Sequence, residues 1–204
     1  MSKPPQQEDT WEQDQSTRSY YYDDAHGYEA YRPTIWTIGH STRDLEEFIG
    51  LLSENGIELL VDVRSYPGSR KFPHFNKESL EVTLPAHGVE YVHLKQLGGR
   101  RRVRPGSKNT AWRSKAFQGY ADYMETDDFR EGIAELLEFS EDKPTAIMCS
   151  EAVWWRCHRS MISDYLKAGG ASVLHILGAG TVQEHPYTSA AKIVNGELSY
   201  EDSA

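Results

Sequence analysis

The first half of the domain carries two apolar runs separated by an amphipathic stretch. Residues 34–39 form a β-branched run that ends in glycine, and residues 57–63 form a second run. Between them, over 45–52, apolar residues recur at the three- and four-residue spacing of a helix. Ser41 or Thr42 is a suitable N-terminal cap for that helix. The pattern predicts a strand–helix–strand unit whose two strands run parallel.

Further apolar runs alternate with helical patterns along the rest of the chain. In chain order we expect a helix at 77–86, a strand at 89–94, helices at 116–125 and 127–139, and strands at 145–148 and 173–177. Asp127 or Asp128 should cap the second of these later helices. An Asn-Gly pair within 193–198 predicts a small C-terminal hairpin. The fold class is therefore α/β: three layers, Rossmann-like, with a mainly parallel central sheet and helices on both faces.

The chain of 204 residues is long enough for one domain with a substantial core. Residues 1–31 differ from the remainder because they are acidic, rich in tyrosine and poor in aliphatic residues. We expect them to form a disordered or loosely docked extension, whose aromatic side chains contact the domain or a protein partner. Residues 32–204 then form the single α/β domain.

Composition excludes several classes of protein. The formal net charge of −9 argues against a generic nucleic-acid binder. We expect no membrane association, because no apolar run approaches the roughly 18 residues of a membrane span. The N-terminal residues lack the apolar segment of a signal peptide, and two cysteines do not make a disulfide framework. A reducing cytoplasm is the expected location.

Polar residues follow three of the predicted strands directly. His40 and Ser41 follow the first strand, Asp62 and Arg64 close the second, and residues 149–151 follow the fourth. The carboxyl ends of parallel strands lie along one edge of a sheet, where ligands bind in α/β folds. These residues should therefore line one crevice. The alternatives are that His40 caps a helix or is a buried core histidine, and that Asp62 and Arg64 form a structural ion pair.

Cys149 is a candidate nucleophile at this crevice. A thiol near a helix N-terminus and a guanidinium has a lowered pKa, which activates it. The alternative is that Cys149 is a small buried hydrophobic residue. Arg156 lies seven positions after Cys149, whereas phosphatases and rhodaneses place the arginine six positions after their cysteine. We therefore do not expect this loop to cradle an anion in the same way.

A metal site is the third option for the same segment. Cys149, Cys157 and His158 are all potential ligands. The two cysteines are farther apart than the roughly two to four intervening residues of structural zinc sites. Adjacent residues of the predicted helix, Cys157 and His158, also point to different faces. We accordingly expect neither a metal nor another cofactor.

Carboxylates provide a further possibility. Glu151 with Asp62 or His40 could position water or stabilise a cationic transition state, as glycosyl transfer requires. Four aromatic residues near these groups could stack on a base: Tyr66, Phe72, Phe75 and Trp155. The remaining candidate substrate contacts are Ser41, His158, and the arginines Arg64 and Arg159, which would hold phosphate.

A basic loop lies between the third strand and the next helix. Residues 95–108 contain six Lys or Arg residues and no acid. Basic side chains near aromatic ones suit phosphate contacts and base stacking. The candidate nucleic-acid contacts are Arg100, Arg101, Arg102, Arg104 and Lys108. Alternatively, the loop is simply solvated and balanced by the acidic remainder of the protein.

The ordered motifs of the chain resemble those of one family. They are residues 37–42 (Thr-Ile-Gly-His-Ser-Thr), 61–64 (Val-Asp-Val-Arg), 97–99 (Leu-Gly-Gly), and Cys149-x-Glu151 with Cys157-His158-Arg159. From about residue 34 to residue 177 the chain resembles the bacterial and archaeal "domain of unknown function 488" family. The resemblance implies a compact α/β domain with these residues as its signature, and it brings no settled activity.

The leading functional hypothesis is an enzyme acting on a nucleotide or nucleic acid, including glycosidic-bond cleavage of the DNA-glycosylase type. His40, Asp62 and Glu151 would then perform acid, base or electrostatic roles. The first alternative is a cysteine-dependent enzyme, with Cys149 acting on a small sulfur- or phosphorus-containing substrate. The second alternative is a non-catalytic module that binds a ligand or nucleic acid.

Overall fold

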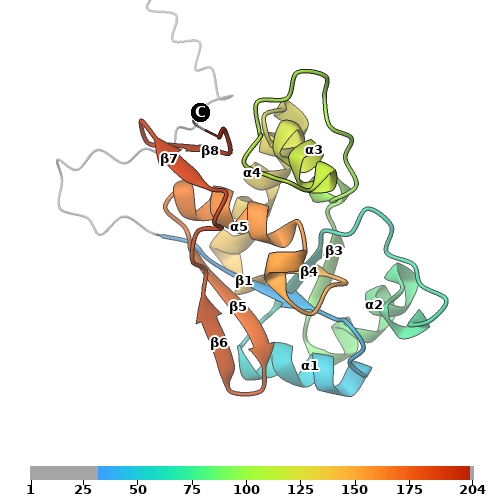
Figure 1. The fold of residues 1–204 in the computed structure, drawn as a ribbon. Helices are drawn as coiled ribbons and strands as arrows, with labels where there is room; N and C mark the ends of the chain where they lie inside the picture. Colours follow the sequence, from blue (N-terminus) through green and yellow to red (C-terminus); the bar gives the residue numbers. More distant parts are fainter. Residues whose placement is uncertain (1–31, 203–204) are drawn as a thin grey trace, which may run out of the picture. The chain divides into compact units, whose positions relative to one another are not determined.

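The computed structural model of the chain describes residues 32–202, so our predictions for residues 1–31 lie outside the described residues. Its centre is a six-stranded sheet with the order β3-β2-β4-β1-β5-β6 (Figure 1). The strands are β1 (Thr34–Gly39), β2 (Leu59–Asp62), β3 (Glu90–His93), β4 (Thr145–Cys149), β5 (Ser172–Gly178) and β6 (Thr181–Glu184). Strands β1 to β5 run parallel, and β6 pairs antiparallel with β5 at one edge.

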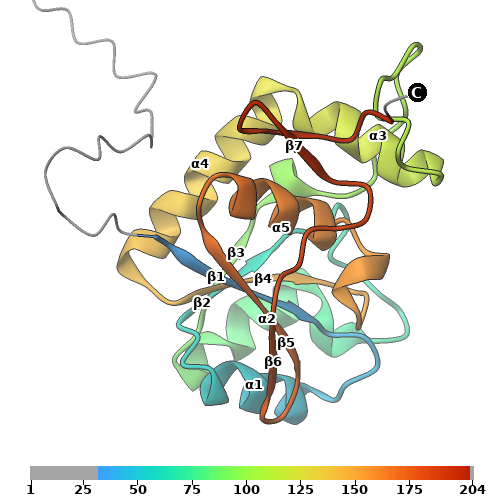
Figure 2. The same ribbon diagram turned by 60° about the vertical axis from the view of Figure 1, so that its left-hand side comes forward.

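Helices cover both faces of this sheet, which makes a three-layer α/β fold (Figure 2). One face carries α3 (Lys115–Met124), α4 (Asp127–Asp142) and α5 (Arg159–Ala168). The other face carries α1 (Leu45–Glu54) and α2 (Lys77–Thr83). Each layer buries its own hydrophobic cluster against the sheet. The predicted fold class is confirmed.

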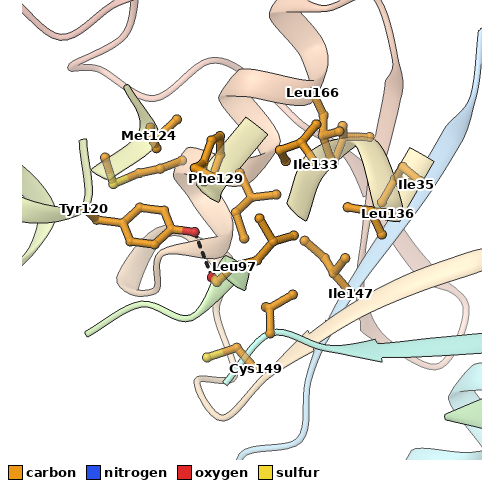
Figure 3. Packing of buried hydrophobic residues seen from close by; sticks show 14 of the residues in the cluster. Ile35, Leu97, Tyr120, Met124, Phe129, Ile133, Leu136, Ile147, Cys149 and Leu166 are labelled. Carbon is orange, nitrogen blue, oxygen red and sulfur yellow. Dashed lines mark hydrogen bonds between the residues drawn. The ribbon is translucent and has the colours of Figure 1, made fainter. Parts of the chain in front are cut away.

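The larger cluster extends from the sheet to its carboxyl edge (Figure 3). Helix α4 contributes Phe129, Ile133 and Leu136, whose spacing places them on one helical face. Burying each such side chain contributes about 1.5–3 kcal/mol. The Tyr120 hydroxyl of α3 donates to the carbonyl of Leu97 at 2.8 Å. This contact attaches α3 to the first residues of the predicted basic loop.

The N-terminal caps differ from those predicted. Asp44 caps α1, rather than Ser41 or Thr42. Ser41 instead has a φ of 49°, the left-handed conformation of a turn. Thr126 caps α4, rather than one of the two aspartates that follow it. All of these side chains can cap a helix, so a sequence with neighbouring candidates does not identify the boundary.

The helix after β4 begins later than the sequence predicts. A short 3-10 helix, η5 (Trp154–Arg156), ends before Cys157, and α5 begins only at Arg159. The prediction that one helix carries Cys157 and His158 was therefore wrong. Because the two residues precede the helix, the helical rotation between neighbouring side chains does not separate them.

The remaining elements are short. They are the 3-10 helices η2 (Pro73–Phe75), η3 (Pro85–His87) and η4 (Lys95–Leu97), and the strands β7 (Lys192–Val194) and β8 (Glu197–Ser199). Strands β7 and β8 form the predicted hairpin, with Asn195 and Gly196 both at positive φ in its turn. Within residues 32–202, no helix combines the length and apolar character needed to cross a membrane.

Candidate functional site

Three strand ends lie side by side at the carboxyl edge of the sheet. Strands β2, β4 and β1 are neighbours, so the polar residues that follow them meet at one place. Backbone hydrogen bonds continue past the strands, from His40 N to the Cys149 carbonyl at 3.1 Å and from Val63 N to the Met148 carbonyl at 3.0 Å. The sheet itself therefore holds these residues in register.

A pocket of about 760 Å³ opens at this edge, within the range of roughly 300–1,000 Å³ common for small-molecule sites. Nine of the residues singled out from the sequence line it: His40, Ser41, Arg64, Tyr66, Phe72, Arg100, Cys149, Glu151 and His158. The strand ends supply the floor, and the segments after β2, β3 and β4 supply the walls. Cys157, a potential metal ligand in the sequence, lines it as well, and the other predicted site residues lie outside the lining.

Asp62 lies behind the pocket rather than in its wall. Its side chain is 0% exposed and pairs with Arg64 at 2.5 Å. The Tyr91 hydroxyl donates to the same carboxylate at 2.7 Å, and Arg64 also donates to the Phe75 carbonyl at 2.8 Å. Asp62 therefore orients the Arg64 guanidinium, and it is not available to act on a ligand.

His40 is a neutral contact in the pocket wall. Burial, together with the positive charge of Arg64, lowers the pKa of His40 to about 4. Its Nδ1 lies 3.1 Å from the Ser41 carbonyl, so Nδ1 carries the proton and donates it. Nε2 is then the acceptor that faces Arg64 Nη1 at 3.3 Å. The ring also stacks on Phe75 with 4.3 Å between ring centroids.

Two thiols and an imidazole meet at the pocket floor. Cys149 ends β4, and Cys157 and His158 directly precede α5. The ligand atoms of the three residues all lie within 4.8 Å of one another. His158 Nδ1 lies 3.5 Å from the Cys157 sulfur and 3.9 Å from the Cys149 sulfur. The sequence argument that Cys157 and His158 point apart was wrong.

The two thiols are electrostatically different. The hydrogen bond to Cys157, followed by burial, raises the pKa of Cys149 to about 12. Burial acts to raise the pKa of Cys157 as well, but the hydrogen bond from Cys149 and the positive charge of Arg159 lower it to about 6. The activation that the sequence suggested for Cys149 therefore belongs to Cys157.

Arg159 is a buried support of the site. Only 1% of this residue is exposed, and it does not line the pocket. The guanidinium donates to the Glu151 carbonyl at 2.5 Å and to Thr37 Oγ1 at 3.3 Å. A side chain at Gly39 would collide with the Glu151 carbonyl and with Arg159, so only glycine fits there. Arg159 thus holds the loop after β4, and Glu151 projects from that loop into the pocket.

Aromatic rings and cations form the mouth of the pocket. Tyr66 is 70% exposed, and the Arg100 guanidinium lies 5.4 Å from the centre of its ring. Phe72 and Arg156 also line the pocket. Within residues 32–202, no carboxylate pairs with Arg100 or Arg156. Both guanidinium groups are available to an anionic ligand.

The rest of the basic loop faces away from the pocket. Arg101 lies over the Tyr123 ring at 3.5 Å and donates to the Gly98 carbonyl. Arg104 pairs with Glu125 at 2.6 Å. Arg102 and Lys108 are exposed and do not line the pocket. Of the five predicted basic contacts, only Arg100 reaches the pocket.

Two predicted stacking residues also lie outside the pocket lining. Phe75 is fully buried beneath His40 and packs against Phe48 of α1. Trp155 is 50% exposed and contacts Trp154 edge to face. The sequence marks both as aromatic residues near the site, but it does not show which way each ring points.

The sequence did not assign Phe117, Tyr120 or Arg156 to the crevice, although Phe117 and Tyr120 follow the basic loop as aromatic residues suited to base stacking. The lining also contains Ser65, Gly68, Ser69 and Ala116, which the sequence did not mark. Arg156 was considered only as part of an anion-binding loop like that of a phosphatase. Its position could have indicated a place in the lining, because Arg156 lies between β4 and α5, on the same segment as Cys157 and His158. Phe117 and Tyr120 belong to α3, and no sequence pattern places that helix beside the pocket.

Fold and site together define a class: an α/β domain whose ligand pocket lies at the carboxyl edge of a parallel sheet, with a Cys-Cys-His cluster at its floor. The family model described as "Domain of unknown function DUF488" matches residues 44–166. The chain belongs to the DUF488 family. No match was found among curated proteins or among solved structures.

Proposed function

We propose that the chain is a hydrolytic enzyme that acts on a nucleotide or on a nucleotide unit of a nucleic acid. The charge of the pocket carries this proposal. The protein has a net charge of −9, yet the pocket lining described here contains three arginines and one carboxylate. Such a local reversal of charge attracts an anionic ligand and fits phosphate groups.

The aromatic lining supports a nucleotide rather than a simple phosphate. Tyr66 and Phe72 lie at the mouth, and Phe117 lies on the α3 side. Exposed rings provide surfaces on which a base can stack, contributing about 1–3 kcal/mol per base. The combination of rings and guanidinium groups matches a ligand that has both a planar ring and a phosphate.

Glu151 is the proposed catalytic carboxylate. It is the carboxylate in the described lining, and its backbone is fixed by Arg159. We propose that it accepts a proton from water as the water oxygen bonds to the sugar carbon. In the same step the bond between that carbon and the base breaks, and its electron pair goes to the base, which takes up a proton from solvent water. Glu151 afterwards returns its proton to solvent. Since Asp62 is held by Arg64, a pair of carboxylates like that of many glycosidases does not fit this pocket.

The test is product analysis after incubation of the full chain with nucleotides and with short single- and double-stranded oligonucleotides. We expect released base, and we expect Glu151→Gln to lower its rate by about 100-fold or more, as for loss of a general base. Glu131→Gln, on the exposed surface of α4, is the matched control and should keep the wild-type rate. Bound oligonucleotide with no product would instead indicate a non-catalytic binding module.

The second candidate is a cysteine-dependent enzyme for a small sulfur- or phosphorus-containing substrate. The position of His158 Nδ1 beside both sulfurs favours it, because an imidazole can remove a thiol proton. For this candidate, Cys157→Ser would abolish turnover while Glu151→Gln would retain it. The reverse result would support the nucleotide hydrolase.

A further inference from the structure

We propose that Cys149, Cys157 and His158 bind a divalent transition-metal ion of the zinc class at the floor of the pocket. The proposal rests first on their convergence from two separate segments, the end of β4 and the chain before α5. The two sulfurs and His158 Nδ1 lie within 4.8 Å of one another. Thiolate and imidazole together are ligands that zinc prefers.

The distances fit a tetrahedral ion. With Zn–S near 2.3 Å and Zn–N near 2.0 Å, neighbouring ligand atoms of a tetrahedron are roughly 3.5–3.8 Å apart. His158 Nδ1 lies 3.5 Å from one sulfur and 3.9 Å from the other. The two sulfurs lie within 4.8 Å of each other, so an ion can be accommodated between the three atoms if the sulfurs close to tetrahedral spacing.

The protonation of His158 is set for metal binding. Its Nε2 lies 2.9 Å from the Val63 carbonyl, which can only accept a hydrogen bond. The proton must therefore be on Nε2, and the lone pair of Nδ1 points to the two sulfurs. Metal-binding histidines are commonly oriented by a hydrogen bond of this kind from the other ring nitrogen.

Packing fixes the same ring. Tyr120 meets it edge to face, with 5.1 Å between ring centroids. Gly99 lies so close that a side chain at this position would collide with the His158 ring. The imidazole is thus held by a backbone carbonyl, an aromatic ring and a glycine before any ion binds.

A buried positive charge lies beside the cluster. Arg159 is buried, acts on the Cys157 sulfur by its charge, and pairs with no carboxylate of residues 32–202. A buried guanidinium needs a nearby negative charge. A metal ion binds cysteines as thiolates, so binding an ion would place negative charge beside this guanidinium.

Three protein ligands leave one tetrahedral position open. Within residues 32–202, no fourth His, Cys or carboxylate joins the cluster. All three ligand residues line the pocket, so the open position faces it. This is the arrangement of catalytic rather than structural zinc sites. A bound ion would polarise an oxygen of the ligand or of water. The metal site does not depend on the nucleotide proposed above.

The experiment is metal binding by the full, untagged chain. The reduced protein is titrated with Co²⁺ in the absence of oxygen, and its absorption is recorded. We expect about one Co²⁺ per chain, with the sulfur-to-cobalt charge-transfer band and the strong visible bands of a tetrahedral site. Zn²⁺ should displace Co²⁺, and protein from cells grown with zinc should contain it by elemental analysis.

Variants identify the ligands. Substituting a residue that only contacts a metal ligand typically lowers metal affinity by about 10–100-fold. Removing a ligand itself, by Cys149→Ser, Cys157→Ser or His158→Gln, should therefore lower Co²⁺ affinity by at least ~100-fold. His93→Gln is the matched control, because His93 Nε2 also contacts a backbone carbonyl, that of Arg64 at 2.8 Å, away from the thiols. It should bind Co²⁺ like the wild type.

One readout needs no variant. In the folded wild-type protein, stoichiometric Zn²⁺ should protect both cysteines from alkylation, as followed by mass spectrometry. The inference is overturned if Co²⁺ gives no charge-transfer band, or if Zn²⁺ does not change alkylation. It is also overturned if the purified protein carries a Cys149–Cys157 disulfide that persists when zinc and reductant are supplied.

Discussion

At the scale of single residues, a buried chain of hydrogen bonds connects Arg159, at the start of α5, to Asp164 in the same helix. Arg159 donates to Thr37 Oγ1, which donates to His175 Nδ1 at 2.7 Å. His175 Nε2 donates to His185 Nδ1 at 2.9 Å, and His185 Nε2 donates to Asp164 at 3.0 Å. Each group donates in the same direction, so every proton position in the chain is determined by its neighbours.

This chain of hydrogen bonds predicts that the fold loses stability in acid. Burial, with the neighbouring His185 and Arg159, lowers the pKa of His175 to about 2. The unfolded chain binds this proton below pH ~6.5 and the folded protein does not, so stability falls as pH drops from ~6.5 towards 2. Between pH 6.5 and 5, His175 should contribute a loss of about 2 kcal/mol in the free energy of unfolding. His40 acts in the same direction down to pH about 4.

The measurement is urea denaturation at several pH values. His175→Gln should be less stable than the wild type at pH 7. Its free energy of unfolding should fall less on acidification, because unfolding of the variant takes up about one proton fewer. His87→Gln, at the exposed surface, is the control. A wild-type pH slope retained in His175→Gln would contradict this account.

Residue types at the strand ends were sufficient to predict that a site exists, but not what each side chain does there. Arg64 lines the pocket as expected, whereas Asp62 lies behind it and pairs with Arg64. The cluster of Cys149, Cys157 and His158 could not be predicted, since it depends on α5 beginning at Arg159. If the helix included Cys157 and His158, their side chains would point apart. Because the helix begins two residues later, the two side chains can meet.

At the scale of elements, the segment after η4 controls the site through backbone contact. It passes so close to His158 that only glycine fits at position 99. We expect Gly99→Ala to displace the imidazole and to destabilise the fold by about 1–3 kcal/mol, the usual effect of overpacking. Gly68→Ala is the matched control, because Gly68 also lines the pocket but has open space around it.

The comparison is made by thermal unfolding together with Co²⁺ absorption. Gly99→Ala should lower both the melting temperature and the intensity of the tetrahedral bands, whereas Gly68→Ala should change neither. Equal behaviour of the two variants would show that close contact with the segment after η4 does not position His158.

Element types were predictable where the apolar pattern is strong. Strands β1, β2, β4 and β5 are buried, and α1 and α4 each show a buried face, so their periods are evident in the sequence. Strand β6 was missed because all four of its residues are exposed, which leaves no apolar alternation to detect. Its formation depends on pairing with β5, a contact that the local sequence does not encode.

At the scale of the whole molecule, charge is divided between an acidic protein and a basic pocket mouth. Arg100 comes from the segment after β3 and Arg156 from the segment after β4, so the mouth forms only when the domain folds. The sequence indicated a basic loop. In the structure only Arg100 of that loop lines the pocket, and Arg156 joins it from the segment after β4. This pairing of guanidinium groups is the basis of the proposed function.

The salt dependence of oligonucleotide binding tests this claim most directly. The affinity for a short single-stranded oligonucleotide is measured by fluorescence anisotropy at increasing salt, for the wild type and for the double variant Arg100→Gln, Arg156→Gln. Each phosphate contact contributes about one unit to the log–log slope, so the double variant should bind more weakly with a slope lower by roughly one to two units. A double variant of Arg113→Gln and Arg130→Gln, two exposed arginines outside the pocket lining, should retain the wild-type slope. No binding by the wild type at low salt, or an unchanged slope in the pocket variant, would contradict the account.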